Sequence, residues 1–361
     1  DAFRSKYFDF MLSNPPYGKS WKSDLERMGG KDGIKDRRFL IEHAGDPEYS
    51  LVTRSSDGQM LFLANMLSKM KQDTRLGSRI AEVHNGSSLF TGDAGQGESN
   101  IRRWIIENDW LEAIVALPLN MFYNTGIATY IWVLTNRKPM HRRGRVQLID
   151  ATQWYKPLRK NLGKKNCELS EEDIRRICDT FTAFEETEQS KIFPNAAFGY
   201  WKVTVERPLR LKGIDPTRAY SPKEIKALKA ERQTDEAAPP VVRKIHRKGT
   251  APDPIHGLFE ATIDGKPAVV EYEPDTDLRD TEQIPLPEEG GIEAFIRREV
   301  LPYAPDAWFV EDSVKTGYEI SFTRYFYKPK PMRTLEEIRA DIRALEKETE
   351  GLLDEILGLT E

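Results

Sequence analysis

The chain has 361 residues, of which 31% are charged and 39% are apolar, and its formal net charge at pH 7 is −4. This length allows two or three domains with cores of their own, and no run approaches the roughly 18 apolar residues of a membrane helix. The slightly acidic net charge excludes binding of nucleic acid through a general excess of basic residues. If the protein binds nucleic acid, we expect either that its basic residues are clustered or that a partner supplies much of the contact.

The cysteine and histidine content indicates the cellular compartment and whether a metal site is expected. Cys167 and Cys178 are the two cysteines of the sequence, and its five histidines are scattered. Two cysteines are too few for a disulfide framework and favour a reducing compartment, so we expect a cytoplasmic protein. The spacing fits no zinc motif, and no metal site is expected.

An apolar run near the start, residues 8–12, predicts a short buried strand, and Asn14, Pro15, Pro16 and Tyr17 follow it closely. Two consecutive prolines fix φ twice and remove two backbone donors, so neither strand nor helix can continue through them. The pattern predicts a stiff loop at the carboxyl end of a strand, where open α/β sheets bind ligands. Its amide, carbonyls and aromatic ring suit a flat group that carries an amino nitrogen. A proline-stiffened surface turn is the alternative.

The elements after this loop alternate in type. Residues 18–50 are polar and glycine-bearing and predict a long loop, either functional or a solvated insertion. Apolar periodicity then predicts helices over 57–76 and 99–108 and strands over 78–83, 110–117, 129–134 and 146–151. This order predicts an α/β fold with a doubly wound parallel sheet and a closing pair of strands that is open to an antiparallel arrangement.

The run Asn14-Pro15-Pro16-Tyr17 after an apolar strand resembles the catalytic motif of S-adenosylmethionine-dependent amino-group methyltransferases, above all the adenine-N6 DNA methyltransferases. Segments 77–90, 101–103 and 113–129 are similar to the methyltransferase (modification) subunit of type I restriction–modification systems. Later segments extend the likeness over nearly the whole chain. The resemblance identifies a Rossmann-like methyltransferase sheet whose amino-terminal strands are missing, followed by an α+β carboxyl-terminal region that ends in a long helix.

The resemblance implies a role for each residue of the motif. The Asn14 side-chain oxygen and the Pro15 carbonyl would accept hydrogen bonds from the exocyclic amino group of adenine, with Pro16 completing the motif. Tyr17 would stack on the base once it has been flipped from the duplex. S-adenosylmethionine is the implied cofactor, and Asn14 and Pro15 are the residues here that would adjoin it. The family's Gly-rich cofactor loop has no counterpart in this sequence, so we expect a fragment that is inactive alone.

Further residues follow from the same resemblance. Phe122 or Tyr123 would supply a second aromatic wall of the base pocket; the alternative is that Met121 and Phe122 are core residues at the edge of the sheet. The densest basic run, residues 137–145, holds four arginines, three of which would contact the DNA backbone, unless the run is a solvated connection between strands. These are Arg142, Arg143 and Arg145.

We expect three domains. Residues 1–152 would be a partial catalytic domain, 153–256 a helical and strand extension with a linker, and 257–361 an α+β module. A hairpin is predicted over 258–272 around Asp264 and Gly265. The helix over 334–357 begins with a capping box, and it carries a narrow apolar stripe that either packs on its own domain or binds a partner helix. Its stripe consists of Leu335, Ile338, Ile342, Leu345, Leu352 and Ile356.

The leading hypothesis is the modification subunit of a type I restriction–modification complex, which methylates the N6 amino group of adenine in DNA. Its implied partners are DNA, a specificity subunit and a restriction endonuclease subunit. Two alternatives stay open. One is a methyltransferase of protein glutamine amides, which pose the same chemical problem, and the other is a non-catalytic scaffold fragment that binds DNA or a partner.

Overall fold

The computed structural model describes residues 3, 5–123, 125–329 and 333–357, and in the last helix the side chains up to 347 together with that of Thr349. The chain forms two compact units, Asp1–Phe322 and Thr323–Glu361. Among the described residues, no helix is long and apolar enough to cross a membrane.

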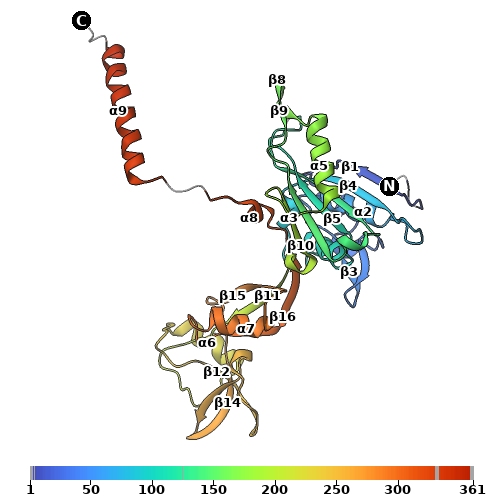
Figure 1. The fold of residues 1–361 in the computed structure, drawn as a ribbon. Coiled ribbons are helices and arrows are strands. Elements are labelled where there is room, and N and C mark those ends of the chain that lie inside the picture. Colours follow the sequence, from blue (N-terminus) through green and yellow to red (C-terminus); the bar gives the residue numbers. More distant parts are fainter. Residues whose placement is uncertain (1–2, 4, 124, 330–332, 358–361) are drawn as a thin grey trace. The chain divides into compact units, whose positions relative to one another are not determined.

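A six-stranded mixed sheet is the centre of the larger unit (Figure 1). β1 pairs in parallel with β4, and β5 pairs in parallel with β7. β6 lies between β4 and β5 and runs antiparallel to both, while β10 is antiparallel to β7. The order across the sheet is β1 (Phe10–Ser13), β4 (Arg79–Asn85), β6 (Thr129–Thr135), β5 (Leu111–Ala116), β7 (Arg145–Asp150) and β10 (Ser190–Pro194).

The expected α/β class is confirmed, and so is an antiparallel arrangement of the pair formed by β5 and β6. A wholly parallel arrangement of the other strands is wrong, because β6 is also antiparallel to β4. The reason lies in the connection from β5 to β6. The described residues of this connection, 117–123 and 125–128, form no helix, whereas a parallel return to the sheet needs a long crossover, which is usually helical.

Helices cover the two faces of this sheet unequally. α2 (Gln59–Leu67) contacts both β4 and α4 (Gly97–Glu107). On the opposite face, α5 (Glu171–Ala183) packs Ile177 and Phe181 on a cluster that includes Val115 and Ile149. A capping box between Ser170 and Asp173 begins α5. The cluster explains why α5 covers the β5–β7 half of its face.

β1 is an edge strand with one exposed side. Met11 is buried, but Phe10 is 77% exposed and Leu12 is 83% exposed. The expectation of a buried strand is therefore wrong for two of its apolar side chains. β1 hydrogen-bonds only to β4 within the described sheet, and alternate side chains of a strand point to opposite faces. The Phe10 and Leu12 side consequently forms an apolar face without cover from the described elements.

Residues 18–50 do not form the structureless loop expected from their polarity. They contain α1 (Lys22–Arg27) and a hairpin of β2 (Leu40–His43) and β3 (Asp46–Ser50). The turn is formed by Ala44 and Gly45, which both have positive φ, 52° and 83°. Alanine rarely adopts such a φ. Because Ala44-Gly45 is not the Asn-Gly or Asp-Gly pair that is typical of a two-residue hairpin turn, the sequence does not predict this hairpin.

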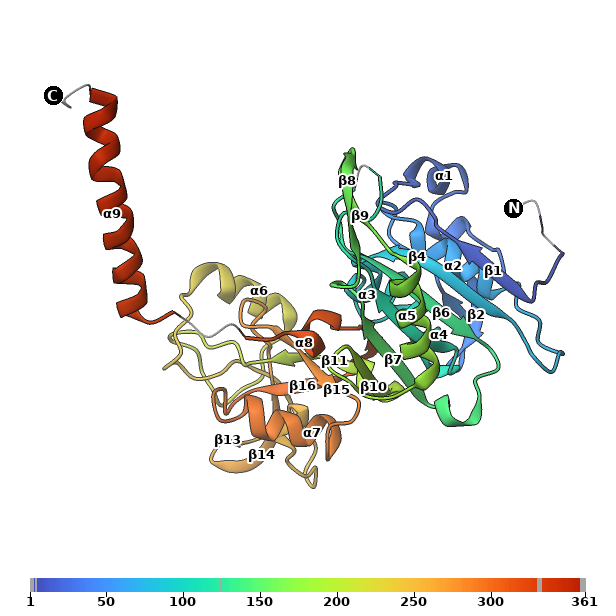
Figure 2. The same ribbon diagram turned by 45° about the horizontal axis from the view of Figure 1, so that its top comes forward.

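Two further three-stranded sheets follow in the larger unit (Figure 2). In the first, β11 (Gly199–Glu206) lies between β15 (Asp280–Pro285) and β16 (Trp308–Tyr318). In the second, β14 (Lys266–Tyr272) lies between β12 (Val242–Ile245) and β13 (Phe259–Ile263). The predicted hairpin is confirmed: β13 and β14 are antiparallel, and Asp264 and Gly265 turn with φ of 49° and 74°.

Other parts of this region differ from the expectation drawn from the sequence. The linker expected within 153–256 corresponds to residues 233–254, whose prolines predict a linker or exposed loop. This segment contains β12, whose Val242 is buried. α6 (Pro222–Glu231) and the short α7 (Gly291–Phe295) complete the region. The division into domains at 152 and 256 stays a prediction.

A fully buried arginine joins the central sheet's helical layer to β16. The Arg102 guanidinium donates to the carbonyls of Tyr318 at 2.5 Å, Ser88 at 2.9 Å and Thr91 at 2.8 Å. Burial lowers the pKa of Arg102 to about 10, so the group stays charged near neutral pH. Charged donors make strong hydrogen bonds where water is excluded, and these three connect α4, the short helix α3 (Ser87–Phe90) and β16.

The smaller unit contains the terminal helix α9 (Leu335–Leu357). Its expected capping box is present: Thr334 N donates to Glu337 Oε2 at 2.8 Å, and Glu337 N donates to Thr334 Oγ1 at 3.2 Å. In the described part of the stripe, Leu335, Ile342 and Leu345 are more than half exposed. The side chains of Leu352 and Ile356 lie outside the described residues.

The alternation along β1 generates a test. Met11→Ala should lower the free energy of unfolding by about 2 kcal/mol or more, because it deletes a buried side chain. Leu12→Ala at the neighbouring exposed position should change it by less than about 0.5 kcal/mol. Urea unfolding followed by tryptophan fluorescence measures both. Equal losses from the two variants would contradict the assigned faces of β1.

Candidate active site

Several chain segments converge at one edge of the central sheet. The parallel strands β1, β4, β5 and β7 all end there, and antiparallel β6 begins there, with Thr129 opposite Asn85 and Tyr130 opposite Ala116. Loops that leave the carboxyl ends of parallel strands form the usual ligand site of such sheets. The Asn14–Tyr17 loop leaves β1 at this edge, and residues 117–128 connect β5 to β6 there.

The residues of the loop after β1 differ in exposure. Asn14 and Pro16 are exposed, Pro15 is buried, and Tyr17 is half-buried. Burial raises the pKa of the Tyr17 phenol above its usual value, so the ring is neutral near pH 7. Buried Pro15 fixes the backbone while the Asn14 amide next to it faces solvent. The site therefore offers a side-chain acceptor and an aromatic ring on a stiff segment.

An open apolar depression of about 370 Å³ adjoins Asn14. It lies on the side of the sheet to which Leu12 points, and β1, β4 and β6 form its floor. None of its lining residues is charged. The residues that line it are Leu12, Ser13, Asn14, Ala81, Val83 and Ile131.

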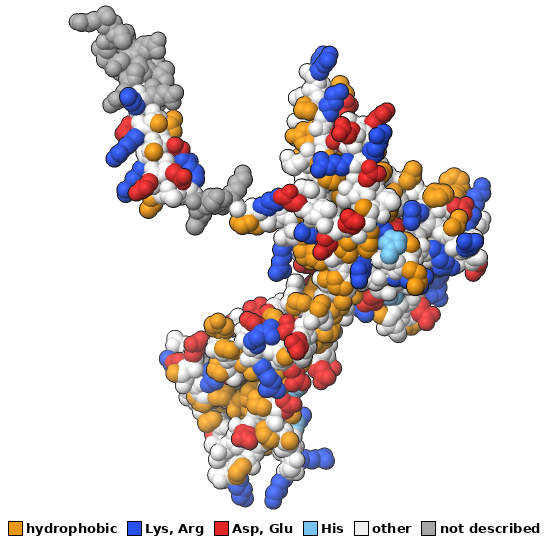
Figure 3. All heavy atoms as spheres, viewed as in Figure 1, with side chains coloured by type: hydrophobic (Ala, Val, Ile, Leu, Met, Phe, Trp, Pro, Cys, Tyr) orange, Lys and Arg blue, Asp and Glu red, His pale blue; other side chains and the backbone are white. Residues whose placement is uncertain are grey.

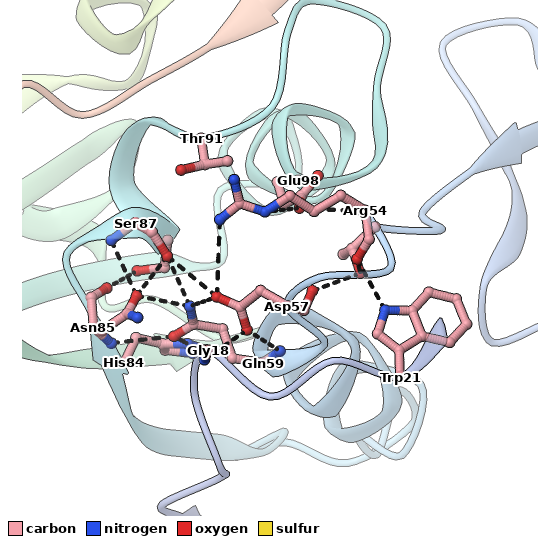
Figure 4. A network of polar contacts seen from close by, with 12 residues as sticks. Gly18, Trp21, Arg54, Asp57, Gln59, His84, Asn85, Ser87, Thr91 and Glu98 are labelled. Atoms are coloured by element: carbon pink, nitrogen blue, oxygen red, sulfur yellow. Dashed lines mark hydrogen bonds and ion pairs between the residues drawn. The ribbon is translucent and has the colours of Figure 1, made fainter. Parts of the chain in front are cut away.

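A buried carboxylate holds the far end of the loop (Figure 4). Asp57 Oδ1 accepts from the backbone N–H of Gly18 at 3.1 Å and from that of Gln59 at 3.1 Å. Asp57 is 6% exposed, so its carboxylate lies largely away from competing water. Gly18 has φ of 68°, which suits glycine at this exit from the loop. Asp57 thus fixes where the loop after Tyr17 leaves the edge.

Gln59 connects Asp57 to the end of β4 through hydrogen bonds. Its Nε2 donates to Asp57 Oδ2 at 2.7 Å and to Asn85 Oδ1 at 2.7 Å, and its Oε1 accepts from the Asn85 backbone N–H at 3.1 Å. The same Oε1 lies 3.2 Å from His84 Nδ1, and His84 Nε2 lies 3.0 Å from Glu82 Oε2. The first turn of α2 is thereby tied to the carboxyl end of β4.

The segment after the loop also returns to this network. Trp21 Nε1 donates to the Arg54 carbonyl at 2.9 Å, and the Arg54 guanidinium lies 3.5 Å from Glu98 and 3.9 Å from Asp57. Figure 4 shows Trp21 and Arg54 on the side of Asp57 opposite to Asn85 and Ser87. Residues 18–21 are therefore held at both ends.

Asp57, Gln59 and Asn85 are not evident as part of the site from the sequence, where Asp57 and Gln59 predict only the start of a helix. In the sequence, Asp57 and Gln59 are a polar pair at the start of an apolar helix, and Asn85 follows an apolar strand. This pattern does not indicate which loop these residues hold. That partner is Gly18, 39 residues before Asp57.

The two aromatic candidates after β5 differ in exposure. Phe122 is half-buried and packs with Met121 on the cluster that contains Val115 and Leu117, as the alternative expectation had it. Tyr123 is 67% exposed. β1 and β5 are three strand spacings apart, or about 14 Å, so the loop that carries Tyr123 lies along the same edge as Tyr17. Tyr123 is the ring with a free face.

The structure corrects one expected DNA contact. Arg142 is 3% exposed; it donates to the Gln147 side chain at 3.2 Å and to the Phe181 carbonyl, and lies 3.6 Å from Glu112. It stabilises the packing of α5 on β7 and cannot reach a phosphate. Arg143 and Arg145 are exposed, and their contact with DNA stays a prediction.

In the ranges that the structure describes, no three His, Cys, Asp or Glu side chains are grouped as metal ligands. Cys167 and Cys178 are both free thiols.

The fold and this edge define an α/β protein that presents an amide and an aromatic ring on a proline-stiffened loop. Residues 1–199 match the family model described as N-6 DNA Methylase, and the chain belongs to that family. The expected resemblance to type I restriction–modification subunits is confirmed by the relatives that follow.

The chain is 29% identical over 188 residues to the type I restriction enzyme MjaIX methylase subunit of Methanocaldococcus jannaschii, covering 52% of this chain and 30% of the relative. It is 28% identical over 179 residues to the MpnII methylase subunit of Mycoplasma pneumoniae, covering 50% and 28%. The chain thus spans about a third of the length of these curated relatives.

Among solved structures, the type I methyltransferase subunit from Streptococcus thermophilus aligns with a TM-score of 0.42 at 23% identity, over 53% of this chain and 36% of that one. A modification subunit of a putative type I restriction enzyme from Vibrio vulnificus aligns with a TM-score of 0.36 at 18% identity, over 52% and 34%.

The network predicts a strong dependence on Asp57. Asp57→Ala leaves the Gly18 and Gln59 backbone donors without their acceptor, so the free energy of unfolding should fall by about 2 kcal/mol or more. Amide hydrogen exchange in a peptide that includes Gly18 should also accelerate. The control is Asp73→Ala, which removes an exposed carboxylate. If both variants exchange and unfold like the wild type, Asp57 does not hold the loop.

Proposed function

We propose that this chain contributes the base-binding half of an adenine-N6 DNA methyltransferase, as the modification subunit of a type I restriction–modification complex. One observation carries the proposal: exposed Asn14 and half-buried Tyr17 lie on a proline-stiffened loop at the carboxyl edge of the sheet, within the segment that matches the family. The same proposal includes the three expected domains, a cytoplasmic location, and a specificity subunit and a restriction subunit as partners.

The chemistry requires acceptors at the amino nitrogen. The lone pair of an exocyclic amino group is delocalised into the base, which makes the nitrogen a poor nucleophile. Asn14 Oδ1 and the Pro15 carbonyl would accept hydrogen bonds from the two N–H groups and draw the nitrogen towards tetrahedral geometry. Because the loop is stiff, these acceptors need no reorganisation when the base arrives.

The aromatic residues would hold the base that has been flipped out of the duplex. Tyr17 stacks on one face of the adenine, a contact worth roughly 1–3 kcal/mol, and exposed Tyr123 approaches from the loop after β5. Phe122, which packs in the core, supports that loop. Arg143 and Arg145 would contact the DNA backbone.

The methyl donor would be S-adenosylmethionine, which supplies an electrophilic methyl group on a sulfonium. The depression beside Asn14 offers an apolar wall for part of this molecule, but its lining has no acidic side chain to bind the ribose hydroxyls. The lining of this depression therefore fits the methyl end of the cofactor and not the whole of it. We propose that the rest of its site lies outside these 361 residues.

Asn14→Ala should abolish methyl transfer to adenine when introduced into the full-length subunit assembled with its specificity partner. The Asn14 side chain is exposed, so thermal unfolding should stay unchanged. Transfer of tritiated methyl to duplex DNA, followed by nucleoside analysis, measures the loss. Methyl groups found on protein glutamine in place of adenine would overturn the proposed substrate.

A pair of Tyr17 variants separates stacking from hydrogen bonding. Tyr17→Phe keeps the ring and should retain most of the transfer rate. Tyr17→Ala should lower kcat/KM by about ten- to a hundredfold, since a stacking contact is worth roughly 1–3 kcal/mol. Equal activity of the two variants would exclude a stacking role for this ring.

The incomplete cofactor wall also gives a test. The 361-residue chain alone should bind S-adenosylmethionine far more weakly than the full-length subunit, because only the methyl end has a fitting surface. Isothermal titration calorimetry compares the two proteins. Equal affinity would show that this chain holds a complete cofactor site elsewhere.

A further inference from the structure

A two-stranded hairpin projects from the catalytic region outside the central sheet. β8 (Lys156–Leu162) and β9 (Lys165–Glu168) pair antiparallel, with Leu162 opposite Lys165, and Gly163 turns with φ of 61°. Figures 1 and 2 show it standing clear of the strands beneath it. At about 3.3 Å per residue, β8 is roughly 20 Å long.

The second strand of this hairpin, β9, is joined to the loop that follows β5. The Asn166 backbone N–H donates to the Asn120 carbonyl at 3.1 Å, and Lys165 Nζ donates to the Met121 carbonyl at 2.8 Å. Cys167 Sγ donates to the Leu119 carbonyl at 3.2 Å. These three consecutive residues therefore hold the segment just before Tyr123. The hairpin and the loop beside the proposed base site form one connected structure.

The hairpin is strongly basic in a chain whose net charge is negative. Residues 155–168 hold five Lys or Arg side chains and one carboxylate, Glu168. Figure 3 shows basic side chains at its tip. After Glu168, the next acidic group along the chain is the first turn of α5, Glu171 to Asp173, which follows the base of the hairpin and not its tip.

The cations towards the tip differ from those of the other basic run in their ion pairs. Arg159, Lys160 and Lys164 are exposed, and in the described part of the chain no carboxylate forms an ion pair with any of them. In the run 137–145, two of the cations already have carboxylate partners: Lys138 lies 2.6 Å from Asp109, and Arg142 is buried beside Glu112. The hairpin therefore offers a cluster of positive charge that no described carboxylate neutralises.

We propose that the β8–β9 hairpin binds the phosphate backbone of duplex DNA beside the target base. Exposed cations on a narrow ribbon suit a polyanion, and a two-stranded ribbon fits a groove of the duplex. The inference rests on the proposed function, because DNA is its substrate. It adds a backbone contact from a segment outside the run that holds Arg142, Arg143 and Arg145.

The test is a triple variant, Arg159→Gln, Lys160→Gln and Lys164→Gln, which leaves Lys165 and its bond to Met121 in place. The matched control removes three exposed lysines from α6 through Lys223→Gln, Lys226→Gln and Lys229→Gln. Both variants change the net charge equally. Fluorescence anisotropy with a labelled duplex measures affinity over a series of salt concentrations, for the 361-residue chain and for the assembled enzyme.

The hairpin variant should bind any duplex about tenfold or more weakly, and its slope of log K against log salt should fall by about 0.9 for each phosphate that the variant no longer neutralises. The control should bind like the wild type. In the assembled enzyme the hairpin variant should raise the KM for DNA and leave kcat nearly unchanged.

Three results would overturn the inference: equal weakening by both variants, no duplex binding by the wild-type chain at low salt, or unchanged DNA binding with impaired subunit assembly. The last would assign the hairpin to an acidic protein surface. Hairpin-dependent DNA binding in an enzyme that does not methylate adenine would refute the proposed function and leave the hairpin inference intact.

Discussion

The hydrogen bond from Gly18 to the Asp57 carboxylate is the constraint on which the site depends. The prolines stop β1 and stiffen the loop, but they do not determine where the chain goes after Tyr17. Asp57 does, because it holds Gly18 at 3.1 Å while Gln59 connects the same carboxylate to Asn85 at the end of β4. A loop fixed at both ends can present acceptors that are already ordered when a ligand binds. The precision of the site therefore resides in a buried network behind it.

The sequence predicted the local elements of the fold better than their long-range partners. Apolar periodicity located α2, α4, β4, β5 and β6, and Asp264-Gly265 located a hairpin. It did not predict that β6 inserts between β4 and β5, since strand order depends on connections and not on composition. Ala44 at a positive φ concealed the β2–β3 turn. Arg142 stands in a run of basic residues and therefore looks like a surface cation. Its burial is not visible in the sequence, because its partner Glu112 lies on a strand 30 residues earlier.

For the candidate site, too, the sequence predicts local features better than long-range partners. The Asn14–Tyr17 motif is visible in the sequence because its residue types are tied to its chemistry. Asp57 and Gln59 are not, because their acceptors and donors lie on segments far along the chain. Exposure separates Tyr123 from Phe122, which the sequence alone leaves equivalent. The sequence favours the 137–145 run over the basic hairpin at 156–168, since a count of charges does not show which of them are already paired.

Under the proposed function, the surfaces of the larger unit would serve the two halves of a transfer reaction. The Asn14–Tyr17 loop, Tyr123 and the basic hairpin would bind the DNA, whereas exposed Phe10 and Leu12 form an apolar face at the depression that would hold the methyl end of the cofactor.

The central claim is that Asn14 and Pro15 bind the amino group of adenine. A structure of the full-length subunit with its partners and duplex DNA tests it most directly. We expect a flipped adenine whose N6 lies about 3 Å from Asn14 Oδ1 and from the Pro15 carbonyl oxygen. An adenine that stays stacked, or whose N6 contacts other residues, would contradict this claim.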